Sequence, residues 1–492
     1  MSTSTNAPAL PADLPTQLYI GGQWRDSDSG ATFDVVDPAS GAVIAQVADA
    51  TPEDGMAALD AAAAAQASWG RVPARERGEM LRRAWGIVHE RRAELAAVMT
   101  LEMGKPLAEA DGEVTYGGEF LRWFSEEAVR VAGRYHPSPE GTMRQLVTKR
   151  PVGPCLFITP WNFPLAMGTR KIAPALAAGC TVILKPAQNT PLTSLFLVKI
   201  LEEAGVPAGV VNILPASRSQ ALTGPIIADP RLRKLSFTGS TAVGRALLAE
   251  ASATVLRTSM ELGGNAPFLV FEDADVDAAV RGAHAAKLRN MGEACTAANR
   301  FYVHESVAEE FTTKLAALFG SLTVAPGYSH GAQVGPIITE LARADIDALV
   351  QGAVADGARI ATGGSVPDGP GFFYPPTVLA DVPQHARILG EEIFGPVAPV
   401  TTFATEEEAL ELANDAEVGL ASYVYTRDMD RVLRISELLE AGMIGVNQGL
   451  LSNAAAPFGG IKQSGLGREG GIEGIEEFLE TVYVSFPDPF RE

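Results

Sequence analysis

The segment 232–251, LRKLSFTGSTAVGRALLAEA, decides the fold class of this chain. Residues 232–237 read as a short strand, and residues 243–251 have the spacing of a helix. The turn Thr238-Gly239-Ser240 joins them. Free backbone N–H groups at a helix start, together with the positive end of the helix dipole, suit a pyrophosphate. Because the turn lacks the usual G-x-G-x-x-G pattern, a dinucleotide site and a plain strand-to-helix turn are equally good interpretations.

The same alternation of strand and helix continues upstream of this segment. Strands are predicted at 155–158, 182–184 and 210–214, and a helix at 194–203. Such alternation predicts parallel βαβ units with helices on both faces of a sheet. Doubly wound sheets bind ligands at the carboxyl ends of their strands, where Lys185 would lie. The alternative for this lysine is an exposed loop position.

Further from the segment, the chain predicts a second α/β body and several accessory parts. Residues 1–14 predict a disordered tail, and 51–103 have helical spacing. A domain boundary is expected near Gly263-Gly264. The second body has predicted strands at 268–271 and 301–303 and predicted helices at 276–289 and 307–319, and it continues through the segments 346–355, 397–403, 407–413 and 443–447. Residues 132–149 and 480–484 fit neither body and predict paired edge strands used in assembly.

The composition of the 492 residues argues against several classes of function. With 39 Lys and Arg against 59 Asp and Glu, the net charge of −20 argues against a surface that binds nucleic acid. Three cysteines without paired spacing argue against a disulfide framework and favour a reducing, cytoplasmic compartment. We expect no membrane insertion, because no apolar run reaches the roughly 20 residues that a span needs. The six histidines have no ligand spacing, so we expect no metal site.

Cys295 is the cysteine best placed for chemistry. Its neighbours in the segment 290–299, NMGEACTAAN, are mostly small and leave room for a substrate, whereas the other two cysteines lie in or next to predicted strands. A thiol nucleophile also needs a carboxylate or water to complete its reaction. Glu261 and Glu392 lie in glycine-rich, apolar sequence, where burial would raise a carboxyl pKa toward the range of a general base. The alternatives are a buried, inert cysteine and ordinary surface acids.

Together these residues resemble the aldehyde dehydrogenase superfamily over nearly the whole chain, from Ile20 to the C-terminal strand. Seven motifs stand in the family's order, which makes the resemblance specific. They are PWNFP (160–164), KPA (185–187), FTGS (237–240), ELGG (261–264), the Cys295 segment, EEIFGP (391–396) and PFGG (457–460). Within the superfamily the chain is most similar to the succinate-semialdehyde dehydrogenases, above all at 169–171, 287–290 and 452–470.

The resemblance implies an NAD(P)-dependent oxidation of succinate semialdehyde to succinate. Cys295 would attack the aldehyde carbon, and the side-chain amide of Asn162 with the Cys295 backbone N–H would hold the developing oxyanion. Hydride transfer to the nicotinamide would turn the thiohemiacetal into a thioester. A water activated by Glu261 would then hydrolyse the thioester.

The family's cofactor positions carry residues that imply NADP or NAD. They are Trp161, Lys185, Gln188, Gly239, Ser240, Glu392 and Phe394. Lys185 and Glu392 would bind the riboses, Phe394 would lie near the nicotinamide, and Ser240 with Trp161 would contact the pyrophosphate region. Many NAD-preferring members have Glu at the position of Gln188, where its charge repels a 2′-phosphate. A neutral Gln does not repel, so we expect NADP or dual use.

Three residues match positions that bind the distal carboxylate of succinate semialdehyde in the resembling family: Arg170, Arg289 and Ser452. A guanidinium offers the planar fork that a carboxylate needs, and a hydroxyl adds a donor. For each arginine alone, the alternative is a surface ion pair. One methylene is worth only about 1–3 kcal/mol in a pocket. Glutarate semialdehyde, an uncharged or aromatic aldehyde, and a binding protein on an enzyme fold therefore remain alternatives.

The resemblance also implies a division of the chain. A Rossmann-type NAD(P)-binding domain would comprise 15–131 and 151–262, an α/β catalytic domain 263–462, and a small β element for oligomerisation 132–150 and 478–492. A homodimer or homotetramer is expected.

Two residues depart from the family pattern. Ala297 replaces a second cysteine common in relatives, so a local disulfide switch is not available. Glu293 stands where Gln is common and would raise the pKa of the nearby thiol.

Overall fold

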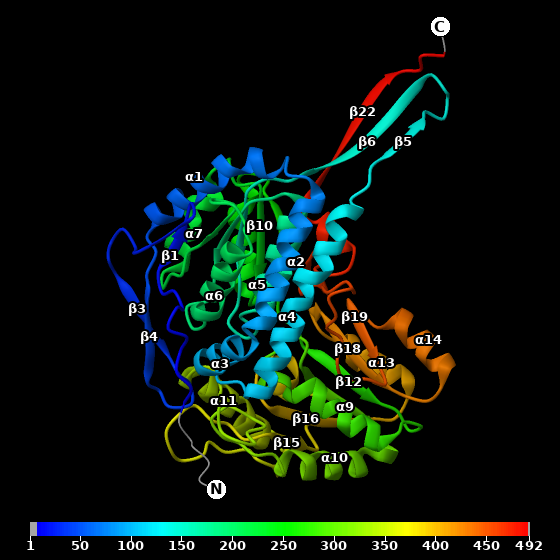
Figure 1. The fold of residues 1–492 in the computed structure, drawn as a ribbon. Helices are drawn as coiled ribbons and strands as arrows, with labels where there is room; N and C mark the ends of the chain where they lie inside the picture. Colours follow the sequence, from blue (N-terminus) through cyan, green and yellow to red (C-terminus); the bar gives the residue numbers. More distant parts are fainter. Residues whose placement is uncertain (1–6, 491–492) are drawn as a thin grey trace.

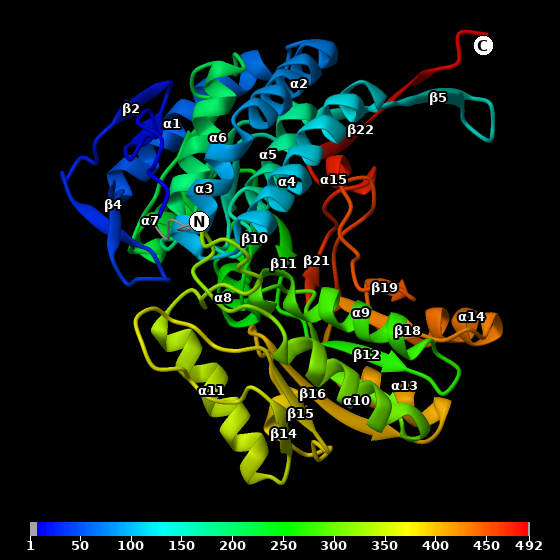
Figure 2. The same ribbon diagram turned by 60° about the horizontal axis from the view of Figure 1, so that its bottom comes forward.

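Two α/β bodies and one projecting three-stranded sheet make up the fold (Figure 1). The computed structural model describes residues 7–490. We call the body around the eight-stranded sheet the first lobe and the body around the seven-stranded sheet the second lobe. Figure 2 shows the first lobe above the second, with the three-stranded sheet extending to one side. The α/β class expected from the sequence is confirmed.

The first sheet has the strand order β2-β1-β9-β8-β7-β10-β11-β21. Its five inner strands are parallel, and its edge strands pair antiparallel. The strands are β1 (Leu18–Ile20), β2 (Gln23–Arg25), β7 (Cys155–Ile158), β8 (Val182–Lys185), β9 (Val211–Ile213), β10 (Lys234–Thr238), β11 (Arg257–Glu261) and β21 (Gly465–Leu466). From β7 the chain builds the sheet in one direction through β8 and β9, and then in the other through β10 and β11. The carboxyl ends of β7 and β10 therefore meet at a topological switch point, the usual ligand site of such sheets.

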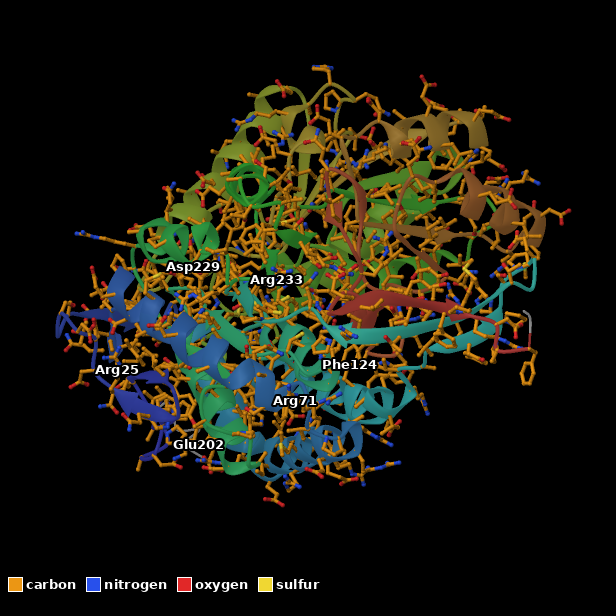
Figure 3. The ribbon with its side chains drawn as sticks, turned by 90° about the horizontal axis from the view of Figure 1, so that it is seen from above. Arg25, Arg71, Phe124, Glu202, Asp229 and Arg233 are labelled. Atoms are coloured by element: carbon orange, nitrogen blue, oxygen red, sulfur yellow. The ribbon has the colours of Figure 1, made fainter. Side chains whose placement is uncertain are left out.

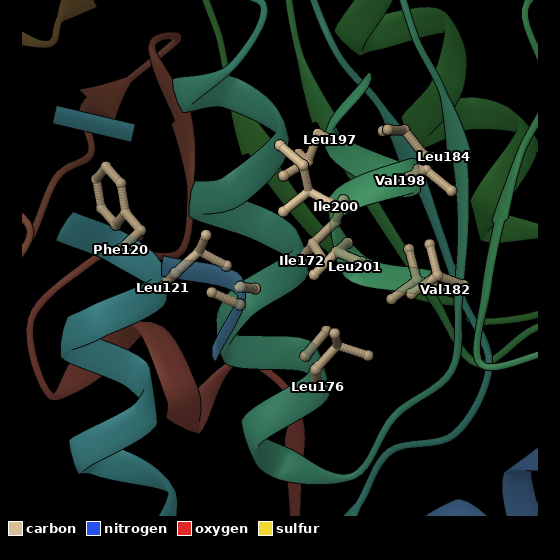
Figure 4. Packing of buried hydrophobic residues seen from close by; sticks show 14 of the residues in the cluster. Phe120, Leu121, Ile172, Leu176, Val182, Leu184, Leu197, Val198, Ile200 and Leu201 are labelled. Atoms are coloured by element: carbon tan, nitrogen blue, oxygen red, sulfur yellow. The ribbon is translucent and has the colours of Figure 1, made fainter. Parts of the chain in front are cut away.

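Helices cover both faces of the first sheet, because successive strand residues point to opposite sides. In β7, Cys155 and Phe157 join the core under α2 to α6, whereas Leu156 joins the core under α1, α7 and α8. Figure 4 shows the first of these cores, where side chains of α5 and α6 meet Val182 and Leu184 of β8. The helices of this lobe are α1 (Pro52–Trp69), α2 (Ala74–Glu90), α3 (Arg92–Met103), α4 (Leu107–Glu127), η1 (Ala128–Arg130), α5 (Ala166–Ala178), α6 (Pro191–Glu203), α7 (Ser219–Ala228), α8 (Thr241–Ser252) and α15 (Glu473–Glu476).

Local signals set the ends of several helices. Thr51 and Asp54 form a reciprocal capping box at the start of α1. The left-handed Gly104, with φ of 93°, follows the last residue of α3. At the start of α8 the Ser240 hydroxyl accepts from the backbone N–H of Val243. The expected helical stretch 51–103 is therefore three helices rather than one.

The N-terminal strands are fastened to the rim of the first lobe by polar contacts. Arg25 of β2 lies 2.6 Å from the Asp54 carboxylate. Trp24 Nε1 donates to Glu202 Oε2 over 2.9 Å. Figure 3 shows Arg25 and Glu202 at the outside of this lobe. The β2 edge strand is thereby tied to α1 and α6.

The expected disordered tail, 1–14, needs a correction for the part that the structure describes. Leu10 and Leu14 pack against the core of the first lobe. Asp13 lies 2.7 Å from Arg91. Residues 7–14 are thus docked on the lobe, since apolar burial and an ion pair offset the entropy of ordering them. Residues 1–6 lie outside the described residues.

The second sheet has the strand order β14-β15-β16-β13-β12-β18-β19, parallel except at β14. Its strands are β12 (Ala266–Val270), β13 (Ala298–His304), β14 (Arg359–Thr362), β15 (Thr377–Ala380), β16 (Val397–Phe403), β18 (Ala421–Tyr425) and β19 (Met443–Val446). Its helices are α9 (Val276–Leu288), η2 (Arg289–Gly292), α10 (Glu305–Gly320), α11 (Glu340–Ala355), α12 (Arg387–Gly390), α13 (Glu406–Asn414) and α14 (Met429–Leu438). Smaller pairings join β3 (Thr32–Val36) to β4 (Val43–Ala48) and β17 (Val418–Gly419) to β20 (Ile461–Lys462).

The chain passes between the lobes at two neighbouring places. It leaves the first sheet after β11 and returns to it as β21, which pairs with β11. Buried Ser464 links the two passages: its carbonyl accepts from Leu262 N–H over 2.9 Å, and its hydroxyl donates to the Gly263 carbonyl over 2.8 Å. The same hydroxyl accepts from Gly419 N–H over 3.0 Å. The expected boundary near Gly263-Gly264 thus falls where the chain changes sheets.

The three-stranded sheet joins the two segments that fitted neither body. Its strands are β5 (Arg134–Pro137), β6 (Met143–Pro151) and β22 (Leu479–Pro487), in the order β22-β6-β5. It projects from the first lobe and carries the C-terminal end of the described chain (Figure 1). Tyr135, Tyr483 and Phe486 are exposed on it. Among residues 7–490, no helix is both long and apolar enough to cross a membrane.

Candidate active site

A cavity of about 220 Å³ lies where the carboxyl ends of β7, β10 and β11 face the second lobe. Its lining combines most of the catalytic and cofactor residues expected from the sequence. The lining residues are Pro160, Trp161, Asn162, Met167, Thr238, Gly239, Ser240, Glu261, Leu262, Gly263, Cys295, Glu392 and Phe394. Residues up to 234 positions apart in the sequence therefore share one site, since Pro160 and Phe394 both belong to this lining.

Cys295 is the partly exposed cysteine of the chain, whereas Cys155 and Cys180 are buried. Burial raises the pKa of the Cys295 thiol to about 12, the charge of Arg170 lowers it, and the carboxylates of Glu392 and Glu261 raise it further. The thiol is therefore protonated at neutral pH without substrate. Its proton must leave as the sulfur attacks a carbonyl.

Glu293, which the sequence places two residues before Cys295, is fully buried, and its Oε1 accepts from Ile338 N–H over 3.0 Å. Burial raises the pKa of this carboxyl well above its usual value. Its effect on the Cys295 thiol stays a prediction.

The turn that presents Cys295 is held in an uncommon conformation. Asn290, Met291 and Gly292 are consecutively left-handed, with φ of 56°, 54° and 79°. Asn tolerates this region better than most residues. A Cβ at Gly292 would lie 2.2 Å from the Gly395 carbonyl oxygen, so this position requires glycine. Strained backbone of this kind is found where surrounding structure fixes a functional residue.

Asn162 is fixed by both lobes. Its Nδ2 donates to the Glu293 carbonyl over 3.0 Å, and its own backbone carbonyl accepts from Asn290 Nδ2 over 3.0 Å and from Lys105 Nζ over 2.8 Å. An amide nitrogen carries two hydrogens, so the second remains available to the cavity. The side chain is thus a fixed donor in the lining that also contains Cys295, and such a donor suits an oxyanion site.

Glu261 ends β11 inside the same cavity and is almost completely buried. Burial and the nearby carboxylate of Glu469 raise the pKa of Glu261 well above its usual value. Its Oε2 has no hydrogen-bond partner among the described residues. A buried carboxyl with a free oxygen and a raised pKa has the properties of a general base.

Glu469 and Lys171 form a buried polar group beside Glu261 that sequence reasoning missed as site residues. Lys171 Nζ lies 2.5 Å from Glu469 Oε1 and donates to Ser236 Oγ over 2.9 Å. Glu469 lies in glycine-rich sequence, as Glu261 and Glu392 do, and this pattern could have indicated that it is a site residue. The two charges compensate each other in a site closed to water.

Several lining residues of the cavity suit part of a dinucleotide cofactor. Ser240, the N-cap of α8, lies in this lining, so the cavity reaches the start of that helix. A Cβ at Gly263 would lie 2.8 Å from Glu392 Oε2, so bare backbone is needed beside this carboxylate. Gly264 N–H donates to Glu392 Oε1 over 3.3 Å, and burial raises the pKa of Glu392 to about 7. The residues therefore combine phosphate donors with an acceptor for ribose hydroxyls.

Of the other expected cofactor residues, Trp161 and Phe394 line this cavity, whereas Lys185 and Gln188 do not. The rings of Trp161 and Phe394 meet edge to face with centroids 5.4 Å apart. Lys185 ends β8 and is buried rather than in an exposed loop, and burial lowers its pKa to about 8. Gln188 is exposed in the turn that follows.

Within residues 7–490, no group of three or more His, Cys, Asp or Glu side chains is arranged to hold a metal ion.

A second cavity of about 390 Å³ contains two of the three expected carboxylate ligands. Its lining residues are Glu109, Gly112, Glu113, Tyr116, Phe163, His284, Ala285, Arg289, Leu450 and Ser452. Arg289 Nη1 donates to Ser452 Oγ over 3.2 Å. The Arg289 guanidinium also lies 4.8 Å from the Phe163 ring centroid and 5.2 Å from that of Tyr116. Aromatic packing thus orients a guanidinium toward open space.

Arg170, the third expected ligand, is not exposed to either cavity. Its side chain is fully buried and forms an ion pair with Glu469. Its guanidinium lies 4.1 Å from the Phe458 ring centroid, and its Nη1 is 3.4 Å from the Tyr116 hydroxyl. The charge of Arg170 is therefore compensated inside the protein. The sequence could not show this, because Glu469 is remote in the chain.

A partly exposed cysteine that shares a cavity with an amide, a buried carboxyl and the start of a helix is the arrangement expected of a cysteine-dependent dehydrogenase. Residues 24–484 match the aldehyde dehydrogenase family, and the chain belongs to that family. It is 63% identical to succinate-semialdehyde dehydrogenase of Paenarthrobacter nicotinovorans, over 91% of this chain and 100% of the relative. It is 47% identical to glutarate-semialdehyde dehydrogenase of Pseudomonas putida, over 95% and 97%. The expected family is thereby confirmed.

A solved structure supports the same assignment. The chain superposes on a crystal structure of an NADP-dependent enzyme from E. coli with a TM-score of 0.95 and 45% identity, covering 96% of this chain and 98% of the other. The similarity thus extends over both lobes and the projecting sheet.

Proposed function

We propose that the protein oxidises succinate semialdehyde to succinate with NADP⁺ or NAD⁺. The observation that carries the proposal is the Arg289–Ser452 pair, which lines a cavity of its own. A guanidinium and a hydroxyl suit a carboxylate. A small apolar cluster has one member in each cavity lining, Phe163 in the Arg289 cavity and Met167 in the Cys295 cavity, and apolar side chains suit the methylenes of a short chain. The cluster consists of Phe163, Ala166, Met167, Ala294 and Ala297. The relative with 63% identity, named for this substrate, supports the same conclusion.

The chain's own residues supply the steps of the reaction. The Cys295 sulfur bonds to the aldehyde carbon as its proton leaves, and Asn162 Nδ2 with the Cys295 backbone N–H stabilises the oxyanion. NAD(P)⁺ held by residues such as Ser240, Glu392 and Phe394 would supply the hydride acceptor that turns the thiohemiacetal on Cys295 into a thioester. Glu261 then removes a proton from a water that attacks the thioester carbonyl. Succinate leaves, and Cys295 regains its thiol.

Replacing Arg289 by Ala tests this substrate assignment. A hydrogen bond to a charged group contributes about 1.5–3 kcal/mol, so kcat/KM for succinate semialdehyde is expected to fall about 10- to 150-fold. For butanal, which has the same carbon number and no carboxylate, kcat/KM is expected to stay nearly unchanged. Steady-state formation of reduced cofactor measures both. Arg281→Ala, on the exposed face of α9, is the control. An equal loss for both aldehydes would contradict a carboxylate ligand.

Glutarate semialdehyde is the second candidate substrate, because the chain is also 47% identical to a glutarate-semialdehyde dehydrogenase. Its one additional methylene changes binding by only about 1–3 kcal/mol. A higher kcat/KM for the five-carbon semialdehyde than for the four-carbon one would establish this alternative. A preference for uncharged or aromatic aldehydes would leave the Arg289–Ser452 pair without a role.

Residues 15–131 and 151–262, which form most of the first lobe, are the proposed NAD(P)-binding domain, and residues 263–462 are the proposed catalytic domain. Gln188 is exposed and neutral and places no negative charge against a 2′-phosphate. We therefore expect NADP⁺ to be used at least as well as NAD⁺. The ratio of kcat/KM for the two cofactors measures this.

The free thiols of Cys155 and Cys180 fit a reducing compartment such as the cytoplasm.

The projecting sheet, 132–150 and 478–492, is the proposed assembly element of a homodimer or homotetramer. Exposed aromatic and apolar side chains on a sheet edge mark an association surface. Phe486→Glu is expected to shift the protein toward a monomer in sedimentation velocity. Val255→Glu, at a residue that is exposed elsewhere, is the control. An unchanged sedimentation coefficient in the Phe486 variant would refute this role.

A further inference from the structure

Tyr116 lies at the anion end of the proposed substrate site. It is a partly exposed residue of α4 and lines the same cavity as Arg289 and Ser452. It also lines an adjoining cavity of about 530 Å³ on the outer side, again with Ser452. Its ring contacts the Arg289 guanidinium and meets Phe120 edge to face, with centroids 5.2 Å apart. The packing of this ring fixes where its hydroxyl group lies.

The hydroxyl of Tyr116 has an unused donor. Arg170 Nη1 lies 3.4 Å from its oxygen, and arginine has donors but no acceptor. The phenol oxygen therefore accepts from Arg170, and the phenol hydrogen has to point elsewhere. Among residues 7–490, this is the one hydrogen bond assigned to the Tyr116 hydroxyl. Its hydrogen remains available to a ligand in the cavity.

The charge behind this hydroxyl strengthens it as a donor. Arg170 is fully buried and ion-paired with Glu469, so it does not reach the cavity itself. A cation that donates to a hydroxyl oxygen polarises the O–H bond, and linked hydrogen bonds of this kind reinforce one another. The guanidinium can thus act on a bound anion through the tyrosine without leaving its ion pair.

We propose that Tyr116 is a specificity-determining residue whose hydroxyl donates to the distal carboxylate of the substrate beside Arg289 and Ser452. Arg170 is then a positioning residue that acts through Tyr116. This inference rests on the proposed function. It replaces the direct contact of Arg170 with the carboxylate that the sequence led us to expect.

Tyr116→Phe isolates the hydroxyl, because it preserves the ring and its contacts with Arg289 and Phe120. We expect KM for succinate semialdehyde to rise about tenfold, as for one hydrogen bond to a charged group, with kcat within about twofold. The inhibition constant of succinate as a competitive inhibitor should rise by a similar factor. The kinetics with butanal should not change. Tyr328→Phe removes a partly exposed hydroxyl that lines neither cavity and is the matched control.

The outcomes separate this inference from the proposed function. If the unsubstituted enzyme does not prefer succinate semialdehyde to butanal, the proposed function itself fails. If it has that preference and Tyr116→Phe retains the original KM and inhibition constant, only the role of Tyr116 is refuted. An equal loss for both aldehydes, or a fall in kcat alone, would show a structural role and would also overturn the inference. Thermal melting of the variant verifies its folding.

Discussion

Replacing Cys295 by Ala is expected to abolish aldehyde oxidation, with kcat lowered by about 10⁴-fold or more. The sulfur forms the covalent bond that allows hydride transfer and hydrolysis to occur as separate steps, and no other described thiol reaches the cavity. Formation of reduced cofactor measures the loss. Binding of the cofactor, followed by quenching of protein fluorescence, should persist, because the donors at the start of α8 are unchanged.

The control for this prediction is Cys155→Ala. Cys155 is buried in β7, on the face that packs under α2 to α6. The change should therefore affect the stability of the protein rather than its chemistry. Activity per folded enzyme should stay near that of the parent. If the Cys295 variant retained more than about one hundredth of the parent kcat, sulfur would not be the nucleophile.

Replacing Glu261 by Gln is expected to separate the two halves of the reaction. An isosteric amide cannot accept a proton from water, so hydrolysis of the thioester should slow by about 10²–10⁴-fold. Formation of the thioester does not need that step. Rapid-mixing experiments should therefore show a burst of about one reduced cofactor per active site, and intact-protein mass spectrometry should find a succinyl group on Cys295.

The pH dependence of the parent enzyme follows from the same carboxyl. Burial and Glu469 raise the pKa of Glu261, and only its deprotonated form can act as a base. Hydrolysis should accordingly decline as the pH falls through this raised pKa and reach its plateau above it. The Gln variant should lack that dependence, whereas Glu340→Gln, at an exposed position of α11, should retain it. If the Glu261→Gln variant turned over at the parent rate without accumulating a thioester on Cys295, Glu261 would not be the general base.

Features set by short stretches of sequence were predictable. The turn at Gly239 and Ser240 was expected because a strand signal and a helix signal meet there, and the structure has β10 and α8 on either side. Cys295 could be distinguished from the other two cysteines by its small neighbours. Its partial exposure agrees with that reasoning.

Features set by distant contacts were not predictable. Arg170 resembled a carboxylate ligand, but its ion pair with Glu469 joins residues 299 positions apart, beyond any local pattern. Two helices at the site, α4 and α5, were also missed. Helix α5 contains Pro174, which ordinarily argues against a helix interior, and tertiary burial of the whole segment overrides that signal.

The link at Ser464 has a consequence for how reactants come and go. The two passages between the lobes are tied to each other and to the Gly419 backbone by hydrogen bonds that are shielded from water. A hinge rotation that swung one half of the molecule away from the other would have to break them and expose their donors and acceptors. Entry and release should therefore proceed by diffusion through the cavity mouths, with the architecture around the sulfur nearly stationary throughout turnover.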